Sequence, residues 1–186
     1  FLYSTLNILQ EFIPIEKSSV LESISQLEIL QKQISSANLT DKNPALELAK
    51  WIDNIPIIYY PAGLRSAAIR FKNSLQENAK THVITEDIIE ACHNGIVAWE
   101  KPTKLQPILL QGTDDYIKTK ERLKILKEFF NEKGIKYQEI FSKDGSILSK
   151  LVCLIYQLDF TSIYNAVLSG IDPSPVDSID FIKSKL

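Results

Sequence analysis

The sequence predicts an α/β fold in which helices cover both faces of a parallel sheet of four or five strands. Short apolar runs bounded by turn residues alternate along the chain with longer stretches of helical periodicity. This alternation is typical of a parallel sheet, because each parallel strand needs a crossover that returns the chain to the same edge. The chain has 186 residues, of which 45% are hydrophobic, so we expect one sizeable core.

Residues 1–40 show only helical patterns. Leucines recur at helical spacing at the start of the chain, in a stripe that begins without a capping residue. After a break at Pro14, we expect a second amphipathic helix to start at Ser18 or Ser19. The chain starts with Phe and contains no methionine, so we expect it to be a piece of a longer translation product.

Residues 41–186 contain the predicted sheet. A helix that opens at Thr40 or Asp41 precedes the first strand. The strands are expected at 55–60, 81–84, 106–111 and 137–141. The helices are expected at 62–80, 86–92, 114–133 and 146–168, with Asp114 as a cap, Gly134 in the left-handed position after the third helix, and a last short helix capped by Ser174.

Composition argues against several classes of function. The net charge is −2 and charged residues are spread along the chain, so we expect no nucleic-acid partner. No apolar run approaches the roughly 20 residues of a membrane span. Cys92 and Cys153 lie too far apart in the sequence to suggest a metal site or a disulfide framework, and two free thiols favour the cytoplasm.

The polar face of the helix expected at 62–80 is the first candidate for function. At about 100° per residue, this face carries Ser66, Arg70, Asn73 and Glu77 within a narrow arc. One interpretation is a solvated face with spaced charges. The position of Glu77 favours the other interpretation, a functional site. Glu77 lies near the C-terminal end of the helix, where the macrodipole disfavours a carboxylate.

Two motifs in this region resemble those of the bifunctional phosphoglucose/phosphomannose isomerases, which belong to the sugar isomerase (SIS) domain superfamily. The first motif reads A-x-R-F-K-x-x-x-x-E-N-A-K and the second reads H-N-x-I-V-x-W-E. The tail from Gly170 to Lys183 also resembles the end of that family. The matching residues of the two motifs are Ala68, Arg70, Phe71, Lys72, Glu77, Asn78, Ala79, Lys80, His93, Asn94, Ile96, Val97, Trp99 and Glu100.

The resemblance implies a domain organisation as well as a fold. It implies a flavodoxin-like, three-layer αβα SIS domain and extends from about Asn43 to the last residue. Members of the family carry two SIS domains in tandem. We therefore expect residues 41–186 to be the C-terminal SIS domain and residues 1–40 to be a helical connector from an N-terminal SIS domain.

The resemblance also implies an aldose–ketose isomerase acting on glucose 6-phosphate, with mannose 6-phosphate as a further candidate. Glu77 matches the base that moves a proton between C1 and C2 of the sugar through a cis-enediolate. His93 matches a histidine that assists ring opening and reaches the site from a neighbouring subunit, so a homodimer is expected. Lys183 matches a lysine near the substrate, with Lys185 as its alternative. No metal or organic cofactor is expected, because general base chemistry suffices.

Arg70 has two interpretations. Its guanidinium can bind the substrate by clamping a phosphate or an enediolate, or it can hold Glu77 in place from the same helix face. The second interpretation is favoured. The loop from Pro61 to Ser66 has a single serine and so lacks a phosphate cradle, which is expected in the N-terminal domain. Gly95 departs from the family, which usually has glutamate at this position.

The alternative function is a non-catalytic SIS module that binds a sugar phosphate or mediates dimerisation. Glu77 discriminates between the two, since a module that only binds an anion has no use for a carboxylate beside it. Self-association is expected through the surface around His93, where Ile96, Val97 and Trp99 are predicted to form an exposed apolar patch.

Overall fold

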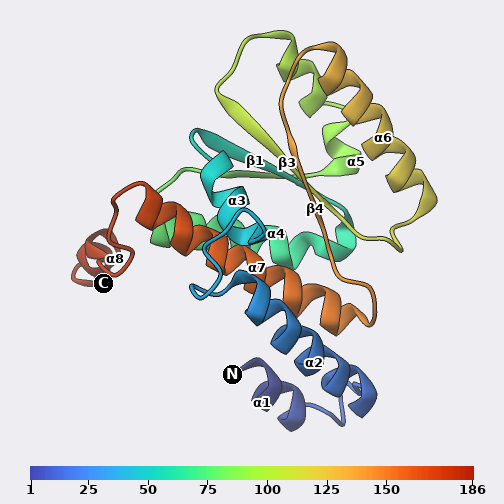
Figure 1. Ribbon diagram of the computed structural model, residues 1–186, viewed down its shortest axis with the longest axis vertical. Helices are drawn as coiled ribbons and strands as arrows, with labels where there is room; N and C mark the ends of the chain where they lie inside the picture. The colour runs from blue at the N-terminus through green and yellow to red at the C-terminus, as the bar shows by residue number, and fades with distance from the viewer.

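The computed structural model describes residues 1–186 and has a parallel four-stranded sheet at its centre (Figure 1). The strands are β1 (Ile55–Tyr60), β2 (Ile84–Asp87), β3 (Leu105–Gln111) and β4 (Gln138–Phe141). Their order in the sheet is β2-β1-β3-β4, with Ile57 paired to Ile84 and Ile58 paired to Ile108. The predicted parallel α/β fold is therefore confirmed, with four strands.

The helices account for most of the remaining chain. Long helices occur near the N-terminus, after β1, after β3 and after β4, as the sequence predicts. In chain order they are α1 (Leu2–Ile8), α2 (Lys17–Ile34), α3 (Pro44–Trp51), the 3-10 turn η1 (Ala62–Leu64), α4 (Arg65–Asn78), α5 (Ile88–Ala91), the 3-10 helix η2 (Gly95–Glu100), α6 (Ile117–Glu132), α7 (Ile147–Leu168) and α8 (Asp177–Lys183).

The sheet separates two hydrophobic cores, because successive side chains of a strand point to opposite faces. Ile58 and Tyr60 of β1 face a core shared with α3, α4 and α7. Ile57 and Tyr59 face a second core shared with α5, η2 and α6. Figure 1 shows these two helical layers on either side of the sheet, which makes the three-layer αβα arrangement.

The N-terminal helices lie outside these layers. α2 packs against α3 and α7 and buries Leu30 and Ile34 in a small third cluster. α1 buries no residue, and Leu21 and Ile29 of α2 are at least half exposed. These N-terminal helices therefore present several apolar side chains to solvent.

α7 is the central helix of one layer. It is the single helix that is long and apolar enough, by length and composition alone, to cross a membrane. It packs against α2, α3 and α4, and its buried residues include Leu154 and Leu158. The expectation of a long helix at 146–168 is confirmed, although fewer than half of its residues are buried. Ser146 caps it by accepting a hydrogen bond from the backbone N–H of Ser149.

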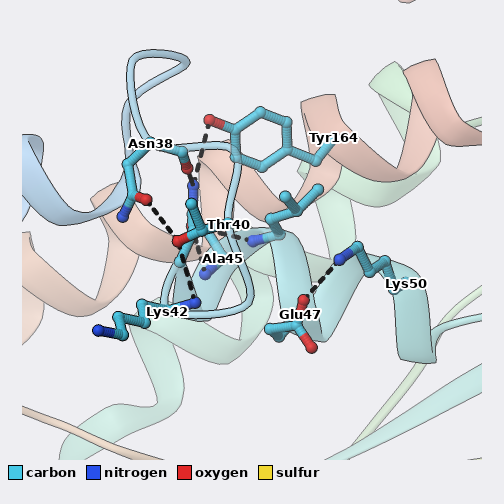
Figure 2. Close-up of polar contacts among 9 residues, drawn as sticks. Asn38, Thr40, Lys42, Ala45, Glu47, Lys50 and Tyr164 are labelled. Carbon is cyan, nitrogen blue, oxygen red and sulfur yellow. Dashed lines mark hydrogen bonds and ion pairs between the residues drawn. The ribbon is translucent and has the colours of Figure 1, made fainter.

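Several predicted helix starts are wrong, and the start of α3 shows why (Figure 2). α2 begins at Lys17, before both predicted caps, Ser18 and Ser19. The Thr40 hydroxyl donates to the Asn38 side chain at 2.7 Å, so it stays in the preceding loop. Asn43 caps α3 instead, because its side-chain oxygen accepts from the N–H groups of Ala45 and Leu46, each at 3.0 Å. The buried Asn43 amide also donates to the carbonyl of Ile34, so contacts distant in the sequence select this cap.

The starts of α6 and α8 also lie later than predicted. α6 begins at Ile117, and Asp114 pairs with Lys150 at 2.6 Å instead of capping the helix. α8 begins at Asp177, after the segment that contains Ser174. β2 likewise begins at Ile84, where the prediction has its last residue.

Candidate active site

Glu77 lies in the last turn of α4, at the amino edge of the sheet. β1 leads through η1 directly into α4, so α4 runs back from the carboxyl edge and ends near the start of β2. The Glu77 side chain is exposed and forms no hydrogen bond or ion pair. It lines an open cavity of 370 Å³ between the end of α4 and the C-terminal tail. The residues that line this cavity are Gln76, Glu77, Lys80, Pro175, Val176, Asp177, Ser178 and Ile179.

Lys80 joins the two walls of this cavity. Its Nζ donates to the carbonyl of Glu77 at 2.6 Å and to the carbonyl of Pro175 at 2.7 Å. The first contact satisfies a carbonyl that the end of a helix leaves without an intrahelical partner. A cation at this place also complements the negative end of the helix dipole.

Arg70 is held by α7 and not by Glu77. Its Nε donates to Asp159 Oδ1 at 3.1 Å and its terminal nitrogen donates to Asp159 Oδ2 at 3.1 Å. The hydrogen bond to Asp159 is the main reason that the pKa of Arg70 is raised. The favoured expectation, that Arg70 holds Glu77, is therefore wrong. Asp159, a carboxylate on a neighbouring helix, accepts the hydrogen bonds of the Arg70 guanidinium instead.

A line of polar contacts continues from Asp159 along the seam between α4 and α7. The Ser74 hydroxyl donates to Asp159 Oδ1 at 2.5 Å. One turn further, the Asn78 amide donates to the Ser162 hydroxyl at 2.7 Å, and that hydroxyl donates to the Asp159 carbonyl at 2.7 Å. These contacts fix the last turn of α4, which carries Glu77, against α7.

His93 lies in the turn that follows α5. Its backbone N–H donates to the Glu90 carbonyl at 2.9 Å, and the Asn94 amide donates to Glu90 Oε1 at 2.8 Å. The His93 side chain is exposed and forms no hydrogen bond. Since its imidazole is free, His93 is available to a second molecule.

Gly95 packs against the Glu86 carboxylate. A Cβ at this position would lie 2.5 Å from Glu86 Oε1, so a side chain here would require the flexible end of Glu86 to move. The Glu86 carboxylate thus occupies the space that a side chain at position 95 would need. Burial, and then the nearby Glu90, raises the pKa of Glu86. The departure from the family at Gly95 is therefore matched by a carboxylate from β2.

The prediction of an exposed apolar patch near His93 is wrong for Trp99. Trp99 is only 7% exposed, and its Nε1 donates to the Tyr59 hydroxyl at 2.9 Å. Its ring packs edge-on against Phe130 with centroids 5.2 Å apart. Ile96 is half-buried and Val97 is exposed. Only Val97 of the three predicted residues remains a largely exposed apolar side chain.

Lys183 lies at the end of α8, exposed and without a hydrogen bond or ion pair. It does not line the cavity beside Glu77. Its neighbour Lys185 stacks over the Phe181 ring at 5.8 Å from the centroid. No three His, Cys, Asp or Glu side chains lie close enough together to hold a metal ion.

The structure therefore brings some of the predicted residues together and separates others. Glu77 and the tail that carries Lys183 share the amino edge of the sheet. His93 follows α5, which begins directly after β2 at the carboxyl edge. Figure 1 shows α5 and α8 on opposite sides of the domain. A single copy of the chain does not place His93 beside Glu77.

The sequence did not reveal the roles of three residues of this region. These are Asp159, Glu86 and Lys80, whose side chain joins α4 to the C-terminal tail. Asp159 had a signal in the sequence, since it is the single acidic residue in the mostly apolar span 147–168. An acidic residue in such a helix is rarely buried without a partner. Glu86 and Lys80 had no comparable signal, because their contacts depend on how distant segments meet.

Comparison with solved structures defines the class to which this fold belongs. The chain superposes on a glucose-6-phosphate isomerase-like protein from Thermus thermophilus with a TM-score of 0.68, at 23% identity, over 83% of this chain and 52% of that one. It superposes on the sugar isomerase domain of an RpiR transcription factor from Sphaerobacter thermophilus with a TM-score of 0.56, at 11% identity, over 91% of this chain and 97% of that one. The fold is that of the SIS phosphosugar isomerase domains.

The chain belongs to the family of the bacterial phosphoglucose isomerase C-terminal SIS domain, whose profile matches residues 41–186. It is 30% identical to the bifunctional phosphoglucose/phosphomannose isomerase of Caldicellulosiruptor bescii, over 99% of this chain and 58% of that protein. It is 28% identical to the enzyme of the same name from Aquifex aeolicus, over 71% of this chain and 42% of that protein. The chain thus spans about half the length of these relatives.

Proposed function

We propose that this chain supplies the general base of an aldose–ketose isomerase that interconverts glucose 6-phosphate, and also mannose 6-phosphate, with fructose 6-phosphate. The observation that carries the proposal is the Glu77 carboxylate, exposed and unpaired beside a cavity of 370 Å³. That volume lies within the range of small-molecule sites. The names of the two relatives above support the same substrates.

In this proposal Glu77 removes the proton from C2 of the open-chain aldose, and the electron pair forms the C1–C2 double bond of a cis-enediolate. The same carboxyl then delivers the proton to C1, while the hydroxyl proton on O2 moves to O1, so that the C2 carbonyl of the ketose forms. One carboxylate suffices for both steps, because C1 and C2 are neighbours. His93 of the partner subunit and Lys183 of the tail assist ring opening and substrate contact, respectively.

Residues 1–40 have a proposed role as the connector to an N-terminal SIS domain that holds the sugar phosphate. The support is a set of exposed apolar residues in this segment, which includes Phe12 and Leu21. Within this chain the turn after β1 offers no cluster of hydroxyl groups to an anion. Arg70 stays a candidate substrate-binding residue, since Asp159 accepts from its Nε and one terminal nitrogen and the side chain is 57% exposed.

The test is Glu77→Gln in the complete protein that carries this sequence. The amide keeps the size of the side chain but cannot take a proton, so turnover should fall by roughly 10²–10⁴. The measurement is the incorporation of solvent deuterium at C2 of the aldose, together with the thermal midpoint. Glu132→Gln is a matched control, because Glu132 is also an exposed carboxylate in the last turn of a helix.

If Glu77→Gln loses deuterium incorporation at C2 with an unchanged thermal midpoint, and Glu132→Gln does not, the result supports Glu77 as the base. Exchange at the parental rate in Glu77→Gln would contradict the proposal and favour the alternative, a non-catalytic SIS module. A collapsed midpoint would instead assign Glu77 a role in folding.

A further inference from the structure

Lys80 is the single residue other than glycine whose backbone is left-handed, with φ of 56°. L-residues with a long side chain rarely adopt this region, because the Cβ approaches the backbone carbonyl. Such a conformation persists only where the surrounding structure compensates for it, and it often marks a functional position.

The other helix ends of this fold show what the backbone itself prefers. α6 and α7 each end with a left-handed residue directly after the C-cap, and in both the residue is glycine. These are Gly134 and Gly170, each with φ of 67°. Lys80 occupies the equivalent position after Ala79, the C-cap of α4. The backbone alone would favour glycine here, so the lysine side chain has another role.

That side chain links two segments 95 residues apart in the sequence. Its ammonium donates to the carbonyls of Glu77 and Pro175 at 2.6 and 2.7 Å. Its charge also lowers the pKa of Asp172 in the tail, after the larger effects of hydrogen bonds from Ser174. The tail has few other anchors, because α8 buries no residue.

The Glu77 cavity exists only while the tail stays in place. Five of the eight residues that line it belong to the tail, from Pro175 to Ile179. Of the remaining three, Gln76 and Glu77 end α4 and Lys80 follows its C-cap. Lys80 therefore touches both walls, and it is the residue whose polar contacts connect them.

We infer that Lys80 is a positioning residue that holds the C-terminal tail against Glu77 and so forms the second wall of the sugar-phosphate site. The identity of the ligand in this inference rests on the proposed function. The tether, meaning the Lys80 hydrogen bonds to the carbonyls of Glu77 and Pro175, does not. The left-handed backbone directs the ammonium toward both carbonyls, and the tether compensates for the backbone conformation. Release of the tail would widen the cavity and weaken substrate binding before it affected the proton transfer at Glu77.

Hydrogen exchange followed by mass spectrometry tests the tether without reference to activity. In Lys80→Met and in Lys80→Gly, the α8 amides should exchange roughly tenfold faster, because two hydrogen bonds to a charged donor are lost. Lys80→Gly should have the higher thermal midpoint of the two, since glycine suits the left-handed backbone. Lys104→Met is the control, because Lys104 is an exposed loop lysine that forms no hydrogen bond or ion pair. Unchanged exchange in α8 in both Lys80 variants would overturn the inference.

Kinetics of the complete protein then test the consequence for the site. Lys80→Gly should raise KM for the sugar phosphate roughly tenfold with a much smaller change in kcat, and Lys80→Arg should recover part of the loss by keeping a cation. Faster exchange in α8 with an unchanged KM would overturn the positioning role. If Glu77→Gln keeps full activity, the proposed function fails, while the exchange of α8 still decides whether Lys80 holds the tail.

Discussion

At the scale of one residue, the Tyr59 hydroxyl shows how burial in this core raises the pKa of a side chain. Burial, the largest cause, raises the pKa of Tyr59 to about 12, and the hydrogen bond from Trp99 partly offsets the rise. In the unfolded chain a tyrosine titrates near pH 10. The folded protein thus keeps a proton that the unfolded chain loses. This group stabilises the fold fully below about pH 10, and its contribution is lost as the pH rises through about 12.

Tyr59→Phe should remove this pH dependence. Between about pH 10 and 12, the free energy of unfolding of the parent should fall relative to the variant by up to about 2–3 kcal/mol, because two pKa units separate the folded and unfolded states. Denaturant unfolding of both proteins at several pH values measures the difference. Parallel curves for the two proteins would show that Tyr59 titrates alike in both states.

At the scale of elements, the seam between α4 and α7 depends on Asp159. This carboxylate accepts from Arg70 and from the buried hydroxyl of Ser74. The Arg70 side chain is 57% exposed and that of Asp159 is 30% exposed, so the ion pair itself contributes little. The larger share comes from Ser74, whose donor would lose its charged acceptor.

Asp159→Asn should therefore lower the free energy of unfolding by about 1–2 kcal/mol, and Arg70→Met should cost less. A double-mutant cycle isolates the pair, and its coupling energy should lie between about 0.2 and 1 kcal/mol. Equal costs for the two single variants would contradict the assignment of Ser74 as the main beneficiary of Asp159.

The exposed apolar residues of α2 lead to a second prediction at this scale. Leu21 is 58% exposed, so Leu21→Lys should change the thermal midpoint of the 186-residue chain by little. In the complete protein the same change should lower the midpoint clearly, because the proposed N-terminal domain covers these residues. Equal midpoint shifts in the short and the complete protein would argue against residues 1–40 as a connector.

The elements of this fold could be predicted where the signal is local. Apolar runs and helical periodicity placed β1, β3 and α7, and glycine placed the ends of α6 and α7. The same periodicity placed Glu77 near a helix end. What failed depends on tertiary contacts: Asn43 caps α3 because it also reaches the carbonyl of Ile34, and Trp99 is buried because it finds the Tyr59 hydroxyl 40 residues away.

At the scale of the whole molecule, the two best-matched catalytic candidates lie at opposite edges of the sheet. Glu77 ends α4 at the amino edge, and His93 follows α5 from the carboxyl edge. A folded domain with a packed core does not bring these edges together. If both residues serve one reaction, they come from two copies of the chain, and each copy contributes half of two equivalent sites.

Mixing two inactive variants tests this arrangement. Glu77→Gln and His93→Ala should each be inactive alone in the complete protein. In a heterodimer, the intact Glu77 of one copy meets the intact His93 of the other, while the second site carries both changes. Random exchange of subunits makes half of the dimers mixed, each with one working site, so activity should return to roughly one quarter of the parental value.

The measurement is isomerase activity after the two variants are dissociated together and reassembled, compared with each variant treated alone. His82→Ala is the control variant, because His82 is also an exposed histidine but lies outside both motifs. It should keep activity by itself, which shows that loss of an exposed imidazole is not harmful in general. Activity that stays at the sum of the two separate variants would mean that His93 acts within its own chain or not at all, and the site would then need another partner for Glu77.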